Sequence, residues 1–240
     1  MENSLTVALA RQSVLRRQMD VIATNLANMN TAGFKSENMV FSEHTEQTAT
    51  GEVLSLVHDV TFMRDLSEGP MTETNSPLSM AIQGKGFFVV DTPEGERYTR
   101  HGVFELNDLG QLTTLDGNPV LGAGGAPITV PPETSTIVVA RDGTISADAA
   151  TIGTLQVVEF DDEQALSKTG SSLYDAEGQP ARPAAEAEVI QGMVEGSNVA
   201  GVAEMTRMID VVRSYQSASQ LAKTEHQRIL DAIEAITGSV

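Results

Sequence analysis

The sequence contains no cysteine. No disulfide, thiolate metal site or cysteine nucleophile can therefore form. A chain without thiols suits a reducing compartment, and it equally suits a protein that crosses a membrane unfolded without becoming cross-linked. Long apolar runs are also missing, because no stretch approaches the roughly 20 apolar residues that span a bilayer. We therefore expect a protein that is not inserted in a membrane.

Basic residues are scarce, since 15 Lys and Arg stand against 33 Asp and Glu, for a net charge of −18. Nucleic-acid binding requires clustered Lys and Arg that neutralise phosphates, so this balance argues against a nucleic-acid partner. It disfavours anionic membrane surfaces for the same reason. The layout of a signal peptide is missing too, because Arg11, Arg16 and Arg17 follow the first apolar residues instead of preceding them. Any export is therefore expected to proceed without a cleaved signal.

An amphipathic helix is predicted at the N-terminus. Along residues 5–29, apolar residues recur at alternating spacings of three and four, which is a heptad seam with one polar member, Gln12. Asn30 and Gly33 mark the end of this helix, and Gly33 allows it to stop in a left-handed conformation. Gln12 either specifies the register of helix pairing or points to solvent at the edge of the seam.

A second long helix is predicted over residues 199–236, a run without proline. A helix with one apolar stripe gains most of its stability from packing that stripe. The two end helices are therefore expected to pair as a coiled coil, with neighbouring chains covering what remains exposed and ordering ends that are loosely ordered in the monomer. The alternative is an ordinary helical hairpin docked on the middle of the chain. The residues expected at the subunit interface are Leu5, Leu15, Met19, Ile22, Leu26, Met29, Val202, Met205, Ile209, Val212, Ile229 and Ile236.

The middle of the chain changes to a β-strand pattern. The apolar run FFVV at 87–90 is followed by short alternating segments, and Asp116-Gly117 is a hairpin signal between two of them. Short strands separated by Gly and Asp turns predict an antiparallel barrel or sandwich. The fold class is therefore α+β, with long terminal helices around a central antiparallel β-rich domain. We expect an N-terminal helix and turn at 1–35, a linker with short structured pieces at 36–79, a β-rich domain at 80–185, and a connecting segment and C-terminal helix at 186–240.

The acidic charge lies in this middle part. Residues 1–35 carry +2 and residues 199–240 carry −1, so residues 36–198 carry −19. Because charge of one sign repels itself, an acidic surface is better placed in solvent than between identical subunits. We therefore expect the ends to face other subunits and the middle to face solvent.

Patterns typical of catalytic, cofactor or metal sites are lacking. The four histidines (His44, His58, His101 and His226) do not have metal-ligand spacing, and each is expected at the surface. The GKG motif at 84–86 leads into a strand and lacks the ending of a phosphate loop. The acidic run at 161–163 lacks the loop pattern of a calcium site, so we interpret it as a solvated turn. The sequence predicts no catalytic residue, cofactor, metal or small-molecule substrate.

Four motifs are distributed along the chain. They are NLAN at 25–28 with Thr31 and GFK at 33–35, GKGFFVV at 84–90, YTRHGVF at 98–104, and QGMVEGSNV at 191–199. Together, and in this order, they resemble the flagellar rod and hook protein family. The first resembles the signature that closes the N-terminal helix of that family, the two central motifs resemble its core, and the last resembles a third segment of the same family. The signature residues at the first helix are Asn25, Asn28, Thr31, Gly33 and Phe34.

The resemblance implies a structural subunit of the bacterial flagellar rod that polymerises through its end helices into the periplasmic drive shaft. It implies that the partners are further copies of this chain and other rod proteins, and that the flagellar type III apparatus exports the chain. It implies neither a substrate nor a cofactor. The motif LRRQM at 15–19 looks most like proximal-rod members of the family, with distal-rod members as the near alternative. Asn25 and Asn28 are expected to hydrogen-bond the helix end rather than to contact neighbouring subunits.

A different class of protein stays open at this point. A secreted β-domain that binds a ligand and carries helical oligomerisation arms has the same order of elements. It requires a deep pocket lined by carboxylates within residues 80–185. A convex acidic surface in that region does not support it.

Overall fold

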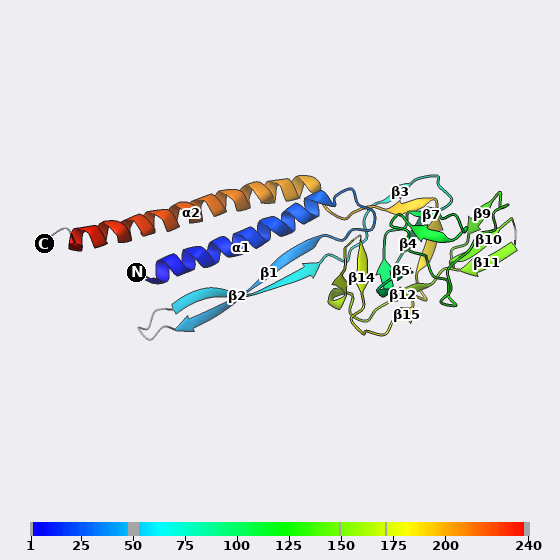
Figure 1. Cartoon of the computed structure of the whole chain (residues 1–240), viewed down its shortest axis with the longest axis horizontal. Helices are drawn as coiled ribbons and strands as arrows, with labels where there is room; N and C mark the ends of the chain where they lie inside the picture. Colours follow the sequence, from blue (N-terminus) through cyan, green and yellow to red (C-terminus); the bar gives the residue numbers. More distant parts are fainter. Residues whose placement is uncertain (1, 48–52, 149, 171, 238–240) are drawn as a thin grey trace. The chain divides into compact units, whose positions relative to one another are not determined.

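Both ends of the chain form long helices in the structure, a computed structural model that describes residues 2–47, 53–148, 150–170 and 172–237 (Figure 1). Helix α1 spans Glu2–Ala27 and helix α2 spans Gly201–Thr237. With the β-rich segment between them, these helices confirm the expected α+β class. The chain forms two compact units, here called the helical unit (Met1–Ala27, Glu37–Asp65 and Val199–Val240) and the β unit (Asn28–Ser36 and Leu66–Asn198).

The helical unit contains a long antiparallel hairpin that the sequence did not reveal. Strands β1 (Glu37–Gln47) and β2 (Val53–Arg64) pair along their length, with a shift in register between Ser42 and Glu43. Helix α1 contacts the hairpin on one side and α2 on the other (Figure 1). A linker with only short structured pieces is therefore wrong for these stretches. An isolated two-stranded hairpin is only marginally stable in water, so this one depends on packing against α1. The sequence of the hairpin itself does not indicate that packing.

The β unit is built on an antiparallel six-stranded sheet in the order β13-β14-β6-β5-β12-β15. Side chains of the central strand alternate between two cores, since Phe88 and Val90 belong to one and Phe87 and Val89 to the other. Burial on both faces explains why the FFVV run is uninterrupted. The bounds are β5 Phe87–Thr92, β6 Gly95–Thr99, β12 Val157–Glu159, β13 Ser167–Lys168, β14 Leu173–Asp175 and β15 Arg182–Pro183.

Smaller sheets complete the β unit. One has the order β11-β10-β9, and the pairs β7-β8, β16-β4 and β17-β3 are two-stranded. The predicted turn at Asp116-Gly117 is confirmed, because Gly117 has φ +83° and its N–H donates to the carbonyl of Thr114 at 2.9 Å. The bounds are β3 Met71–Glu73, β4 Met80–Gln83, β7 Phe104–Leu106, β8 Leu112–Thr114, β9 Ile137–Val139, β10 Thr144–Ala147, β11 Ala150–Thr154, the 3₁₀ helix Glu163–Ala165, β16 Glu188–Gln191 and β17 Met193–Glu195.

Candidate functional site

Three charged side chains meet in the interior of the β unit, and each comes from a different sequence motif. Lys35 belongs to GFK, Arg100 to YTRHGVF, and Glu195 to QGMVEGSNV, and their exposed fractions are 5%, 4% and 1%. The Nζ of Lys35 donates to Oε1 of Glu195 at 2.5 Å, and Nη1 of Arg100 lies 3.6 Å from Oε2. One carboxylate thus pairs with two cations. We call these three residues the buried charged cluster.

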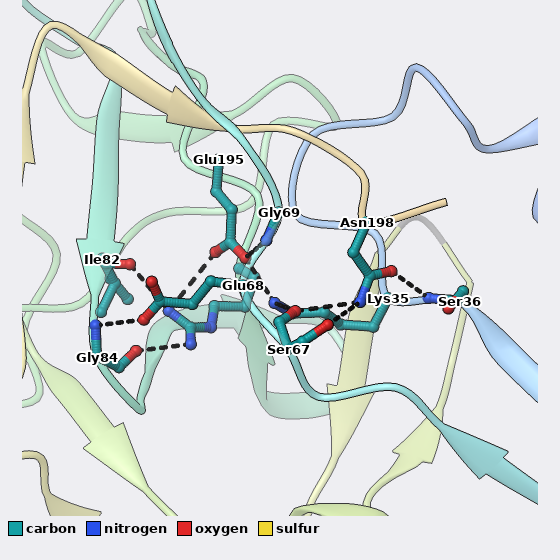
Figure 2. Close-up of polar contacts among 10 residues, drawn as sticks. Lys35, Ser36, Ser67, Glu68, Gly69, Ile82, Gly84, Glu195 and Asn198 are labelled. Atoms are coloured by element: carbon teal, nitrogen blue, oxygen red, sulfur yellow. Dashed lines mark hydrogen bonds and ion pairs between the residues drawn. The ribbon is translucent and has the colours of Figure 1, made fainter. Parts of the chain in front are cut away.

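The Lys35–Glu195 pair also binds backbone groups of a third segment. Nζ of Lys35 donates to the carbonyl of Ser67 at 2.7 Å, and the N–H of Gly69 donates to Oε1 of Glu195 at 3.1 Å (Figure 2). Moving two charges out of water is costly unless further hydrogen bonds satisfy them. The backbone of 67–69 supplies those bonds, so the pair fixes this segment as well as the two residues that form it.

Arg100 ties the cluster to strand β4 and the turn that follows. Its guanidinium donates from Nη1 to the carbonyl of Ile82 at 3.1 Å and from Nη2 to the carbonyl of Gly84 at 2.7 Å. On the same turn, the N–H of Gly84 donates to Oε1 of Glu68 at 2.7 Å (Figure 2). A planar guanidinium presents several donors in fixed directions, which suits it to join two carbonyls and a carboxylate.

Glycine is required where the backbones around the cluster approach one another. A Cβ at Gly69 would lie 2.0 Å from the carbonyl oxygen of Gly196. At Gly33, with φ +66°, a Cβ would lie 2.5 Å from the backbone carbon of Arg100, and the N–H of Gly33 donates to the carbonyl of Glu195 at 2.8 Å. The expectation that Gly33 only ends the helix is wrong. Helix α1 ends at Ala27, and Gly33 is needed for contact with the cluster.

Asn198 binds the segments together at the edge of the cluster. Its Oδ1 accepts from the N–H of Ser36 at 2.7 Å, and its Nδ2 donates to the carbonyl of Ser67 at 3.1 Å (Figure 2). Ser36 and Asn198 are the last residues of the two segments of the β unit, and Leu66 begins the second. The places where the chain enters and leaves the β unit are therefore bound to one another.

Phe34 and Thr31, two of the signature residues, lie in the same part of the β unit. Phe34 is 2% exposed, and Nζ of Lys168 lies 4.1 Å from the centre of its ring. The hydroxyl of Thr31 donates to Oδ1 of Asn28 at 3.1 Å. Asn28 therefore accepts a hydrogen bond close after the helix end, in agreement with the role expected of it.

Asn25 has a different role from the one expected. It is 1% exposed, and its amide joins α1 to the first residue of β1. Nδ2 donates to the carbonyl of Glu37 at 2.8 Å, and Oδ1 accepts from the N–H of Glu37 at 2.9 Å. Glu37 is paired in register with Arg64 of β2, and Asn25 binds its backbone N–H and carbonyl from α1. This is a contact between helix and hairpin within the helical unit rather than a cap of the helix end.

The expected interface residues of α1 lie on its covered side. Ile22 is buried, as is Ala8 of the same seam, and Leu15, Met19 and Leu26 are half-buried. Met29 is exposed beyond the helix end, and the side chain of Leu5 lies outside the described residues. This seam packs within the helical unit, so a role between subunits stays a prediction.

The expected interface residues of α2 lie mostly on its open side. Val202, Met205 and Ile209 are 82%, 48% and 52% exposed, and we call them the α2 stripe. Among the side chains of this helix that the structure describes, the buried ones are instead Glu204, Val211 and Ala218. Val212 and Ile229 are half-buried, and the side chain of Ile236 lies outside the described residues.

A hollow lies beside His101 in the β unit, where the sequence predicts no ligand site. Its volume is about 200 Å³, and its lining includes His101, Asp116 and several hydroxyl side chains. Burial lowers the pKa of His101, which is half-buried rather than at the surface. His226 is exposed, while the side chains of His44 and His58 lie outside the described residues. Asp161 pairs with Arg182 at 2.8 Å in an exposed turn, as expected of that acidic run.

Among the described residues, no three His, Asp or Glu side chains are grouped as metal ligands would be. Neither helix, over its described residues, has a stretch long and apolar enough to cross a membrane.

Three segments of the chain match families of flagellar proteins. Residues 5–35 match the family described as Flagella basal body rod protein, residues 81–147 match the Flagellar hook protein FlgE/F/G D1 domain, and residues 190–235 match the Flagellar basal body rod FlgEFG protein C-terminal. Each matched segment contains one residue of the buried charged cluster. The three matches therefore meet at one place in the structure.

Full-length relatives agree with these matches. The flagellar basal-body rod protein FlgF of Caulobacter vibrioides is 38% identical, over 98% of each chain. FlgF of Salmonella typhimurium is 36% identical over 90% of this chain and 91% of its own. The flagellar basal-body rod protein FlgG of Bacillus subtilis is 30% identical over 97% of this chain and 98% of its own. The chain belongs to the flagellar basal-body rod protein family.

Proposed function

We propose that this chain is a structural subunit of the flagellar rod and has no catalytic activity. The observation that carries the proposal is the pair of end helices, which lie side by side (Figure 1). Helix α2 also keeps an exposed apolar stripe. Exposed apolar side chains along one helix favour contact with another protein. We infer that α1 and α2 pair as a coiled coil and that the remaining surface of the helices binds neighbouring subunits.

The proximal rod is the proposed position. Similarity to FlgF relatives supports it, since three of them are 38%, 34% and 32% identical over nearly the whole chain. The FlgG of Caulobacter vibrioides is 31% identical. The partners are then further copies of this chain and other rod proteins, in the periplasmic part of the basal body. Delivery by the flagellar type III export apparatus, without a cleaved signal, belongs to the same proposal.

Deletion of the gene followed by imaging of basal bodies tests the function. We expect non-motile cells with incomplete rods, and complementation by the intact chain should restore both. Motile cells with intact rods after deletion would overturn the proposal. Expression in strains that lack either FlgF or FlgG tests the position, because a proximal-rod subunit restores motility in the first strain and fails in the second.

A further inference from the structure

A groove in the helical unit lies between α1 and the β1–β2 hairpin. It has a volume of about 260 Å³, and its lining side chains are Arg17, Asp20, Val21, Thr24, Glu37 and Phe62. We call it the α1–hairpin groove. Phe62 is 53% exposed in it, so half of a large aromatic side chain remains in water. Apolar surface of this kind gains free energy when another surface covers it.

The α2 stripe is a second open surface of the same unit. Its residues follow helical spacing, and they lie roughly 150° around the helix from Glu204, Val211 and Ala218, the buried side. The stripe is therefore on a different face of α2 from the one that packs in the helical unit. Because α2 packs in the helical unit through its buried face, the stripe stays available to a second chain.

The two surfaces agree in length, and each carries charges of both signs. Along α1 the groove runs from Arg17 to Thr24, and the stripe runs from Val202 to Ile209. At 1.5 Å per residue, each is about two helical turns, or roughly 10 Å. Exposed Arg17 and Asp20 lie beside the apolar part of the groove, which Glu37 also lines. Exposed Asp210 and Arg213 follow the stripe on α2. The groove thus offers one cation and two anions, and the end of the stripe offers one anion and one cation.

We propose that the α2 stripe of one copy docks in the α1–hairpin groove of the next copy, with Arg17 of one beside Asp210 of the other. The inference rests on the proposed function and specifies which surfaces join identical subunits. Groove and stripe are different surfaces, so the contact is heterologous. Each added copy leaves one groove and one stripe open, and the assembly can therefore grow in one direction as a rod does.

A reciprocal charge exchange tests the contact. Arg17→Asp and Asp210→Arg should each raise the concentration at which the purified chain self-associates by about tenfold, because each places like charges opposite one another. The double variant should recover most of the association. Arg16→Asp is the matched control, since Arg16 is exposed on α1 outside the groove. Equal effects of Arg16→Asp and Arg17→Asp, or a double variant no better than the singles, would overturn the contact.

The absence of cysteine allows a direct test of proximity. Chains with Val21→Cys and chains with Met205→Cys are mixed, assembled and treated with a short bismaleimide. We expect a dimer containing both chains, and a much weaker product when Ala23→Cys, an exposed position outside the groove, replaces Val21→Cys. Equal products from the two mixtures, or none, would overturn the docking.

The same cysteines in cells separate this inference from the proposed function. In purified basal bodies, Met205→Cys should cross-link to Val21→Cys of a second copy. A product joining Met205→Cys to a different rod protein would overturn the second copy as the occupant. A chain missing from basal bodies altogether would contradict the proposed function, whereas a chain that enters rods without this cross-link contradicts only the docking.

Discussion

At the scale of single residues, Glu195 holds two buried cations in place, because its carboxylate lies between Lys35 and Arg100. Glu195→Gln leaves both cations buried without their anion, which costs about 3–5 kcal/mol for a broken buried pair. We expect the free energy of unfolding, measured by urea titration, to fall by about that amount. Glu188→Gln is the control, because it removes an exposed pair with Arg141 worth about 0–1 kcal/mol. Similar losses in the two variants would contradict a stabilising role for the buried pair.

Asn25 provides a second test at this scale. Asn25→Asp keeps the acceptor for the N–H of Glu37 but removes the donor to its carbonyl, and it adds a charge at a buried position. Leaving a buried polar group unpaired costs about 1–3 kcal/mol. We expect that loss in urea titrations, together with faster amide exchange at the start of β1. Asn30→Asp, which adds the same charge at an exposed position, should change neither. Unchanged exchange in β1 for Asn25→Asp would refute the link between helix and hairpin.

His101 makes stability depend on pH. Burial lowers the pKa of its imidazole, and the carboxylate of Asp116 opposes this shift only in part. The unfolded chain therefore binds the proton more readily than the folded chain. Stability is full above the ordinary pKa of 6.5 and is lost as the pH falls through that value towards the lower pKa of the folded state. Urea midpoints should decrease from about pH 7.5 to about pH 5, and His101→Gln should flatten the decrease. An identical slope in the variant would rule out His101 as its source.

At the scale of elements, the turn after α1 depends on Gly33. Alanine at this position would adopt a left-handed conformation, which costs roughly 1–2 kcal/mol, and its Cβ would lie 2.5 Å from the backbone of Arg100. We expect Gly33→Ala to lower the melting temperature by several degrees, as a loss above about 1 kcal/mol does. Gly124→Ala is the control, since a Cβ there has no heavy atom within 4 Å. A melting temperature equal to that of the control variant would contradict the close approach.

Elements with a local pattern could be predicted from the sequence. The period of three and four residues indicated α1 and α2, and the apolar FFVV run indicated β5. The β1–β2 hairpin could not be predicted because β1 is largely polar and the apolar residues of β2 do not alternate strictly. The support that the hairpin receives from α1 comes from elsewhere in the chain. The apolar pattern of α2 predicts the stripe as an interface, and the stripe is exposed in the single chain. The face of α2 that packs within the chain instead contains Glu204 and Val211, which the apolar pattern does not select.

The charged cluster shows why a site can be hidden in recognised motifs. Lys35, Arg100 and Glu195 all lie in motifs that resemble the family, yet Lys35 and Glu195 are 160 positions apart in the sequence. Spacing along the chain says nothing about such a contact, and 15 cations and 33 anions allow many pairings. The one local signal is the position of Glu195 at the end of a short apolar strand and before the small residues that follow it. A carboxylate buried at such a position requires a charged or hydrogen-bonding partner.

At the scale of the whole molecule, the distribution of charge agrees with the proposed division of tasks. By the bounds of the two units, the helical unit carries −5 and the β unit carries −13. Like charges repel across a contact, so surfaces with little net charge approach identical copies at a lower cost. The α2 stripe and the α1–hairpin groove both belong to the helical unit, and both keep apolar side chains in solvent. Contact between copies is therefore expected there and not on the acidic β unit.

This division predicts how order changes on assembly. Beyond the stripe, α2 also exposes Leu221, Leu230 and Ile233, so much of its apolar surface is uncovered in one chain. Helices gain most of their stability from packing. We therefore expect amide protons of α1 and α2 to exchange rapidly in the isolated chain at micromolar concentration and to become protected in assembled rods. Amides of β5, where Phe88 and Val89 are fully buried, are the internal control and should be protected in both states. Protection of the two helices in the isolated chain that matches β5 would contradict ordering by assembly, and would favour a helical hairpin that is stable within one chain.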